Sequence, residues 1–389
     1  MPNATPIHIA LFSTTPYAFL MQRPQQLAQA LVRAGCTVAF VNPVRNPISA
    51  LVHRLWQSLW HTPEPVGYGA VDVITLDQYQ IPIARIPILP YNTTAERIKR
   101  SLDVRLDAFF ERPGTHVALL ETPLWIRSLP FERFDLLCYD CIDEWEIISA
   151  GEPEEHKADQ RETVGRAGAI FYTAENLRRE LEELAPKVPL IKIPNGVDYD
   201  WFQSRTAQTN TFRRADPSRL VVGYIGAVYD WIDLGLLINL ARLRPSMKFV
   251  LVGPLSRTNR KLLAGAPRNL VAVGAVPYSE VPMRVQQFDV CLIPFKNISV
   301  AHTTDPIKLY EYFALGKPVV ATPMHELKVY EAEGLLKFAD TPEAFAQAIE
   351  EAAGSDTEVL CEKRRAVARR NSWGDRAARM LQAIREQLE

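Results

Sequence analysis

Residues 305–320 read DPIKLYEYFALGKPVV, which predicts a short helix followed by the start of a strand. Asp305 suits the N-cap of this helix, and Gly316 suits the position just past its end. A helix start directs backbone N–H groups and a partial positive charge outward, so it can bind phosphate. Lys308 can add a point charge, and Glu311, one turn later, can accept two hydrogen bonds from a diol. The segment is therefore either a site for a sugar nucleotide or a capped surface helix with a Lys–Glu pair.

Short apolar runs alternate with longer amphipathic stretches on both sides of this segment, which predicts parallel α/β sheets. The predicted strands of the first half are residues 7–12, 37–41, 116–121, 136–139, 169–172 and 190–193. Those of the second half are residues 220–225, 248–252, 270–273, 290–293 and 318–321. The predicted helices are residues 22–34, 231–243, 279–286, 306–315, 342–353 and 357–370.

The alternation breaks over residues 194–218, which are polar and irregular and contain the turn signal Asn195-Gly196. A chain of 389 residues is also too long for one ordinary core. We therefore expect two α/β domains, residues 1–200 and 201–371, that face each other across a cleft. Residues 372–389 are expected to form a C-terminal helix that packs back on the first domain. Ligands bind at the carboxyl ends of the strands in such sheets, so the functional residues should directly follow strands.

The composition excludes several classes of protein. A net charge of −1 gives no basic field for nucleic acid. Five scattered cysteines do not suggest a disulfide framework and favour a reducing compartment. We find no signal peptide and no apolar run near the roughly 18–20 residues of a spanning helix. We expect a cytoplasmic protein that can contact the inner face of a membrane without crossing it.

The segment at 305–320 resembles the donor signature of GT-B glycosyltransferases of the group 1 type. In that signature a glutamate stands just before a small-residue–Gly-x-Pro-Val-Val run, which Glu311 and residues 316–320 match. An earlier glutamate of the family would fall at position 303, where this chain has Thr303. In the family that glutamate touches the transferred sugar, often in retaining enzymes. Its replacement therefore argues against a retaining mechanism.

Other motifs, spread over nearly the whole chain, are similar to those of the same family. They are the inter-domain turn at 195–198, the glycine loop at 223–226, the Val-Gly-Pro run at 252–254 and the base-binding loop at 274–278. The resemblance implies a GT-B fold of two Rossmann-like domains. The donor-binding residues that it implies are Gly226, Val276, Tyr278, Thr304, Asp305, Lys308 and Glu311. The Arg and Lys that often follow the family's glycine loop are absent here. We therefore expect Lys308 to neutralise the negative charge of the phosphates.

Residues 22–28, QRPQQLA, resemble the first helix of a subgroup linked to cell-surface polysaccharides. Gln22 and Arg23 at its start are candidates to contact donor phosphate or an acidic acceptor. The alternative is that Arg23 is an ordinary surface arginine.

The loop at 139–145, YDCIDEW, follows a predicted strand and carries two aspartates. A carboxylate placed there can take the proton from an attacking sugar hydroxyl. Related inverting enzymes have such an aspartate in a Tyr-x-x-x-Asp loop, and that spacing selects Asp143 as the catalytic base. Asp140 is the second candidate, and it can instead cap backbone N–H groups, as can Asp143.

Three further features bear on partners and cofactors. Residues 51–60 predict an amphipathic helix with two tryptophans, which either docks on a membrane or lipid-linked acceptor or packs on its own domain. Cys138 and Cys141 form a C-x-x-C pair without a second pair, so we expect no zinc or redox role. The chain has no Asp-x-Asp motif. We expect no cofactor and no metal, because a helix start and Lys308 can neutralise the leaving phosphates.

Together these features imply a metal-independent, inverting glycosyltransferase of cell-surface polysaccharide or glycoconjugate synthesis. Its donor would be a nucleotide-diphosphate sugar, UDP rather than GDP, and its acceptor a saccharide or a lipid-linked group. The alternatives are a GT-B sugar-nucleotide epimerase and a non-catalytic sugar-nucleotide-binding protein. A nicotinamide dehydrogenase is disfavoured, since no G-x-G-x-x-G follows the first strand.

Overall fold

The computed structural model describes residues 5–43, 71–74, 91–143, 153–185, 187–206, 212, 215–216, 218–297 and 303–389. The chain forms two compact units: unit 1 comprises Met1–Ile193 and Arg376–Glu389, and unit 2 comprises Pro194–Asp375. The amphipathic helix predicted at 51–60 lies outside the described residues. In the part of the chain that is described, no helix has the length and apolar character needed to cross a membrane.

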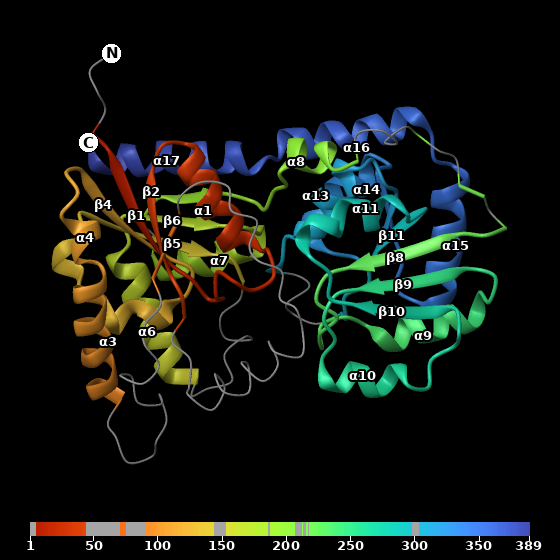
Figure 1. The fold of residues 1–389 in the computed structure, drawn as a ribbon, viewed down its shortest axis with the longest axis horizontal. Coiled ribbons are helices and arrows are strands. Elements are labelled where there is room, and N and C mark those ends of the chain that lie inside the picture. Colours follow the sequence, from red (N-terminus) through yellow and green to blue (C-terminus); the bar gives the residue numbers. More distant parts are fainter. Residues whose placement is uncertain are drawn as a thin grey trace. The chain divides into compact units, whose positions relative to one another are not determined.

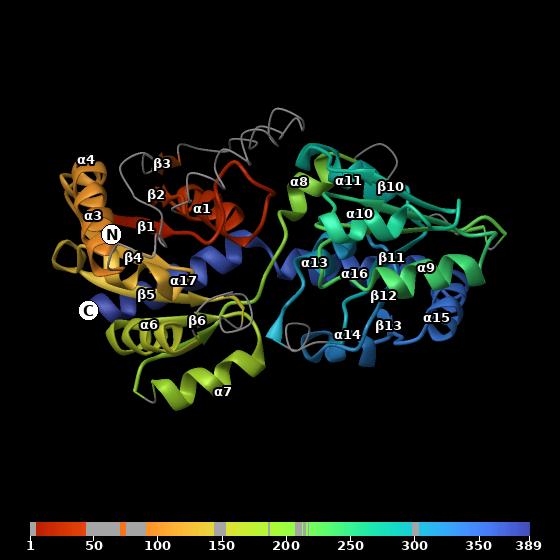
Figure 2. The ribbon, with the colours of Figure 1, turned by 90° about the horizontal axis from the view of Figure 1, so that it is seen from below.

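Unit 1 is built on one parallel sheet with the strand order β3-β2-β1-β4-β5-β6-β7, and helices lie on both sides of it (Figures 1 and 2). Its strands are β1 (Ile7–Phe12), β2 (Thr37–Val41), β3 (Asp72–Ile74), β4 (Thr115–Leu120), β5 (Leu136–Cys141), β6 (Ala169–Tyr172) and β7 (Leu190–Lys192). Its helices are α1 (Arg23–Arg33), α3 (Tyr91–Arg105), α4 (Asp107–Phe110), α6 (Pro153–Arg166), α7 (Glu175–Leu184) and most of α17 (Trp373–Leu388), with 3₁₀ turns η1 (Pro123–Ser128) and η2 (Phe131–Arg133). Every residue of β1 is buried, as expected for a parallel strand covered on both faces.

Unit 2 repeats this plan with the order β10-β9-β8-β11-β12-β13. Its strands are β8 (Val221–Ile225), β9 (Lys248–Val252), β10 (Leu270–Gly274), β11 (Val290–Ile293), β12 (Val319–Ala321) and β13 (Leu336–Phe338). Its helices are α8 (Tyr199–Ser204), α9 (Leu234–Leu243), α10 (Arg257–Leu263), α11 (Val281–Gln286), α13 (Ile307–Ala314), α14 (Lys328–Ala332), α15 (Pro342–Gly354) and α16 (Glu358–Arg370), with 3₁₀ turns η3 (Tyr278–Glu280) and η4 (His325–Leu327). The α/β architecture predicted for both halves is confirmed.

One local prediction is wrong. Helix α13 begins at Ile307 with Pro306 as its N-cap, and no side chain caps it. Asp305 lies one residue too early, and its carboxylate instead accepts hydrogen bonds from the Asn195 N–H (2.6 Å) and the Tyr310 hydroxyl (3.0 Å). These two donors, one far along the chain and one within α13 itself, engage the carboxylate that the capping rule assigned to the helix start.

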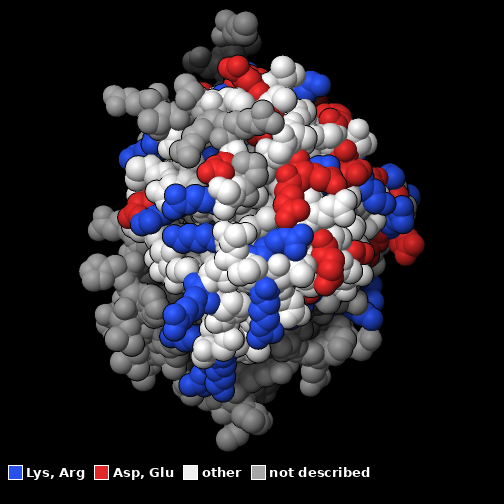
Figure 3. Space-filling view, turned by 90° about the vertical axis from the view of Figure 1, so that its right-hand side faces the viewer, with Lys and Arg blue, Asp and Glu red and all other residues white. Residues whose placement is uncertain are grey.

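All five cysteines are free and buried: Cys36, Cys138, Cys141, Cys291 and Cys361. Surface charge is mixed. Figure 3 shows a face on which Lys and Arg are interspersed with Asp and Glu, so neither sign covers it.

Candidate active site

Three adjacent strands of unit 2 each lead into a glycine with a positive φ angle: Gly226 (147°) after β8, Gly253 (143°) after β9 and Gly274 (87°) at the end of β10. The Gly226 N–H donates to the Val252 carbonyl and the Gly253 N–H to the Gly274 carbonyl. A Cβ atom at Gly253 would lie 1.9 Å from the Gly226 carbonyl oxygen. The backbone therefore packs closely at the carboxyl ends of these strands, where only glycine fits.

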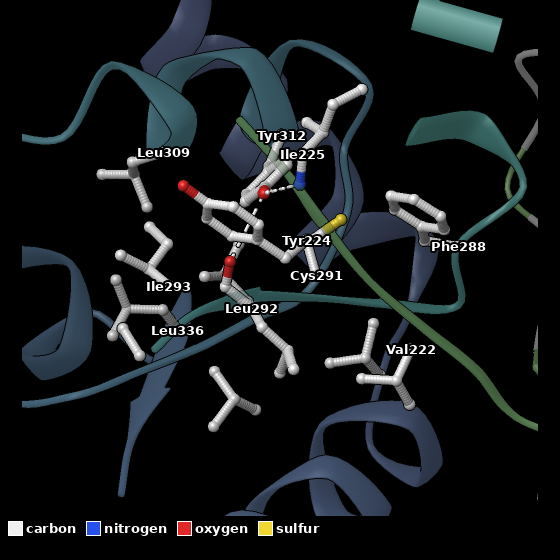
Figure 4. Close-up of a cluster of buried hydrophobic side chains, with 14 of the residues drawn as sticks. Val222, Tyr224, Ile225, Phe288, Cys291, Leu292, Ile293, Leu309, Tyr312 and Leu336 are labelled. Atoms are coloured by element: carbon white, nitrogen blue, oxygen red, sulfur yellow. Dashed lines mark hydrogen bonds between the residues drawn. The ribbon is translucent and has the colours of Figure 1, made fainter. Parts of the chain in front are cut away.

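Helix α13 is fixed against the sheet by one buried tyrosine. The Tyr312 hydroxyl accepts a hydrogen bond from the Ile225 N–H of β8 (3.0 Å) and donates to the Leu292 carbonyl of β11 (3.3 Å), as Figure 4 shows. At the other end Gly316, with φ +70°, closes the helix: its N–H donates to the Phe313 carbonyl, and the N–H of Lys317 donates to the Tyr312 carbonyl. This Schellman motif confirms the predicted role of Gly316.

The fixed helix brings four of the predicted donor residues together. The Lys308 ammonium lies 2.8 Å from Glu311 Oε2, and the Tyr278 hydroxyl donates to Glu311 Oε1 at 3.1 Å. Lys308 also borders the glycine loop, because a Cβ atom at Gly226 would lie 3.0 Å from Lys308 Cε. Glu311 is 1% exposed, whereas Lys308 is 23% exposed. The ammonium can thus reach a ligand while the carboxylate stays protected from water.

Sequence reasoning missed one residue of this cluster, Trp201 on α8. Its ring stacks on Tyr278, with 4.9 Å between centroids and an interplanar angle of 11°. The stack fixes the phenol that binds Glu311. No short motif marks Trp201, since the two rings are separated by 77 positions in the sequence.

The remaining predicted donor residues have different environments. Val276 is half-buried and packs against the core of unit 2, and Thr304 is also half-buried. Asp305 is 2% exposed and joins the turn at Asn195 to Tyr310, as described above. Its carboxylate is engaged within the protein, so we assign it to holding the loop before α13. The contacts of all seven residues with a donor remain predictions.

In unit 1 the structure pairs two predicted site residues, Arg23 and Asp140. Arg23 Nε donates to Asp140 Oδ2 at 2.8 Å, and Nη2 donates to Oδ1 at 2.7 Å. The side chains are 3% and 0% exposed, so Arg23 is not a surface arginine. The pair joins the first residue of α1 to β5, and such a bidentate arrangement is strong and directional. The half-buried Gln22 precedes it, and its N–H donates to Gln25 Oε1 at 3.1 Å.

Asp143 lies two residues after the end of β5 and is half-buried. Its carbonyl oxygen lies 3.9 Å from the Cys141 sulfur. Burial raises the pKa of both the Cys138 and Cys141 thiols above the ordinary value, which keeps them protonated and unreactive. The catalytic role of Asp143 remains a prediction.

The second residue that sequence reasoning missed is Glu121, which follows β4. It is 2% exposed, and its Oε2 accepts the Thr14 N–H at 3.4 Å. Burial raises its pKa to about 8, the charge of Asp140 adds to the shift, and Ser13, Arg23 and Thr14 partly oppose it. The available signal was an acidic residue at the end of a buried strand. The sequence analysis places Glu121 at the end of the predicted strand 116–121 and in no site.

In the described part of the chain, no three His, Cys, Asp or Glu side chains are arranged to hold a metal ion. The expectation of a metal-independent site remains untested.

Comparisons with known proteins show what the part of the chain that carries Gly226, Tyr278, Lys308 and Glu311 is similar to. Residues 219–354 match the family model described as glycosyl transferases group 1. This part of the chain is thus similar to the group 1 glycosyltransferases. The resemblance of the sequence to this family is thereby confirmed.

A similar protein extends the likeness beyond residues 219–354. TuaH of Bacillus subtilis (strain 168), named as a teichuronic acid biosynthesis glycosyltransferase, is 28% identical over 262 residues. The match covers 62% of this chain and 64% of that protein. The chain thus spans a little under two thirds of this relative's length.

Several solved structures match nearly the whole chain. Sucrose-phosphate synthase of Thermosynechococcus elongatus has a TM-score of 0.72 and 16% identity, and the match covers 97% of this chain and 98% of that one. Anabaena HepE in complex with UDP and glucose has a TM-score of 0.59 and 15% identity, covering 97% and 100%. These likenesses confirm the predicted GT-B fold of two Rossmann-like units.

Proposed function

We propose that the chain transfers a sugar from a UDP-sugar to a saccharide or lipid-linked acceptor in the synthesis of a surface polysaccharide or glycoconjugate. The observation that carries this proposal is the Lys308–Glu311 pair on α13, held beside Gly226. The UDP bound to HepE and the name of TuaH support the choice of donor and pathway class.

On the donor side, the ammonium of Lys308 would bind the diphosphate. It has three donor hydrogens, so its bond to Glu311 leaves others for phosphate oxygens. Each Glu311 oxygen keeps a second lone pair. Because the side chain is 1% exposed, Lys308 or Tyr278 has to move aside before the two oxygens can accept the hydrogen bonds of a ribose diol. As the bond from the anomeric carbon to the diphosphate breaks, Lys308 and the start of α13 would stabilise the negative charge that develops. This arrangement requires no metal.

On the acceptor side, Asp143 would act as general base. The acceptor oxygen forms its bond to the anomeric carbon from the face opposite the diphosphate, and Asp143 takes the hydroxyl proton. One displacement of this kind inverts the anomeric configuration. Asp140, fully occupied by Arg23, would orient the loop rather than take the proton.

A thermal-shift screen of nucleotide sugars tests the donor site. A ligand that binds only the folded state raises the melting temperature by mass action, and we expect the largest rise with a UDP-sugar. Lys308→Ala should reduce this rise to near zero. Lys337→Ala is the matched control, because Lys337 forms a Lys–Glu pair of similar length (2.9 Å) that is solvent-exposed. The proposal fails if no nucleotide sugar shifts the wild type, or if both variants respond alike.

The Asp143→Asn variant tests the base. Turnover should fall about 10²–10⁴-fold, the usual contribution of general acid–base catalysis, while the UDP-sugar shift persists. Proton NMR of the wild-type product should show the inverted anomer. Unchanged turnover in the variant would exclude Asp143 as the base, and a retained anomer would exclude single displacement. Conversion of the nucleotide sugar without an acceptor would indicate the epimerase.

A further inference from the structure

The Arg23–Asp140 pair has a third ionisable neighbour, Glu121. The three residues come from α1, β5 and the end of β4, and all are at most 3% exposed. Both Asp140 oxygens accept hydrogen bonds from Arg23. Glu121 Oε1 is buried and has no hydrogen-bond partner among the described residues. Among the groups that act on Glu121, Arg23 is the cation, and it already donates two hydrogen bonds to Asp140.

A second buried carboxylate without a cation of its own raises the free energy of the folded state. The charges of the three groups cancel only when one carboxyl is neutral. Asp140 holds the arginine, which leaves Glu121 as the neutral one. The charged groups that act on it are Asp140 and Arg23, and the neighbouring polar groups are the Ser13 hydroxyl and the Thr14 N–H. Burial and the like charge of Asp140 raise its pKa to about 8, in agreement with this balance.

Glu121 also contacts the loop between β1 and α1, residues 13–22. Thr14 donates to Glu121 Oε2, the Ser13 carbonyl accepts from Trp125 Nε1 (3.2 Å), and the Pro16 carbonyl accepts from Gln25 Nε2 (2.9 Å). The loop leads directly into Arg23 at the start of α1. The charge on Glu121 thus acts on both ends of this loop.

We propose that Glu121 carries a proton in the resting protein and is a positioning residue, which holds the β1–α1 loop and leaves the bidentate Arg23–Asp140 pair intact. Loss of that proton to solvent creates a carboxylate that competes with Asp140 for the guanidinium. Arg23 then shifts, and the loop and the neighbouring β5 end that carries Asp143 shift with it. The effect on turnover rests on the proposed function; the bound proton does not.

The test compares the wild type with Glu121→Gln, which mimics the neutral carboxyl, and with Glu111→Gln, an exposed control in the same unit. Wild-type kcat/KM for the acceptor should fall about tenfold for each pH unit above an apparent pKa near 8. Glu111→Gln should show the same fall, and Glu121→Gln should stay within about threefold of its pH 7 value up to pH 9. The UDP-sugar thermal shift should be equal in all three proteins, because Lys308 and Glu311 belong to unit 2.

Two measurements on the bound proton need no turnover. Carbon-13 NMR of wild type labelled at glutamate should show one carboxyl that titrates near pH 8 and is absent from Glu121→Gln. Because the pKa of Glu121 is raised above its unfolded value of about 4.5, the stability it contributes is complete below that pH and is lost as pH rises to about 8. The melting temperature of the wild type should therefore fall relative to that of Glu121→Gln as the pH rises from about 4.5 to about 8.

Each outcome bears on a different part of the proposal. If no wild-type glutamate titrates above about pH 6.5, the bound proton is excluded, even if Glu121→Gln fails to fold. If one does titrate but Glu121→Gln keeps the alkaline fall in kcat/KM, the positioning role is excluded. If the protein shows no transfer activity at all, the proposed function fails while the NMR and stability results still decide the proton.

Discussion

At the scale of single residues, the grouping of Tyr278, Lys308 and Glu311 depends on a glycine at position 226. Gly226 has φ +147°, and a Cβ atom there would meet the Tyr224 hydroxyl at 2.8 Å and Lys308 Cε at 3.0 Å. Both the backbone conformation and the position of Lys308 therefore require glycine.

We expect Gly226→Ala to weaken UDP-sugar binding at least about tenfold and to lower the free energy of unfolding by about 1–3 kcal/mol, through backbone strain and the displaced lysine. Isothermal titration calorimetry and chemical denaturation measure the two effects. Gly354→Ala is the control, since no atom lies within 4 Å of its Cβ position. Equal affinity in both variants would show that the glycine loop is remote from the donor.

The residue scale also shows the limit of sequence reasoning. Lys308 and Glu311 could be selected because a helix places residues three apart on one face. The Arg23–Asp140 pair joins residues 117 positions apart, and Glu121 joins the same cluster only through the order of β1, β4 and β5 in the sheet. Contacts between residues so far apart produce no periodic pattern in the sequence, so they could be identified only in the structure.

At the scale of elements, α13 is fixed by its sheet contacts rather than by its own start. No side chain caps the helix. The Tyr312 hydroxyl instead joins it to the Ile225 N–H and the Leu292 carbonyl. The two hydrogen bonds of this hydroxyl therefore decide how rigidly α13 holds Lys308 and Glu311.

Tyr312→Phe should lower the free energy of unfolding by about 1–3 kcal/mol, because the Ile225 N–H is left buried and unpaired. Tyr229→Phe is the control, because the Tyr229 hydroxyl makes no hydrogen bond to the described residues. It should change the free energy of unfolding by less than about 0.5 kcal/mol. Urea denaturation followed by circular dichroism gives both values. A Tyr312→Phe variant as stable as the control would mean that α13 is held by packing alone.

Element prediction from sequence worked where the apolar run was continuous. The bounds of β1, β2, β6, β9 and β11 were predicted correctly, since these strands are largely buried within their sheets. The strands β3 and β13 were missed, whereas β7 and β12, which are equally short, were predicted, so length alone does not explain the difference.

At the scale of the whole molecule, the chain leaves unit 1 at Ile193 and returns to it at Arg376, within α17. In unit 2 the two connecting segments are bonded to each other: the Val197 N–H donates to the Asn371 carbonyl, and the Trp373 N–H donates to the Val197 carbonyl. A Cβ atom at Gly196 would lie 2.6 Å from the Asn371 oxygen, so this contact requires glycine. The last helix is thus an integral part of unit 1 although it follows unit 2 in sequence.

Ile384→Ala should therefore destabilise unit 1 by about 2–5 kcal/mol, the usual cost of truncating a fully buried isoleucine. Ile384 is 0% exposed, whereas Leu388 at the end of the same helix is 36% exposed. Leu388→Ala is the matched control and should cost less than about 1 kcal/mol. Denaturation midpoints that move equally in both variants would contradict a structural role for α17.

The burial of every cysteine has a practical consequence. Burial raises the pKa of the thiols, to about 11 for Cys36 and about 12 for Cys291, so dye-maleimide reagents should leave the native protein unlabelled at neutral pH. Exposed positions such as Val104 in unit 1 and Val329 in unit 2 offer sites for introduced cysteines. A doubly labelled protein would then report the distance between the units by fluorescence energy transfer, with and without a nucleotide sugar, and with no native thiol to remove.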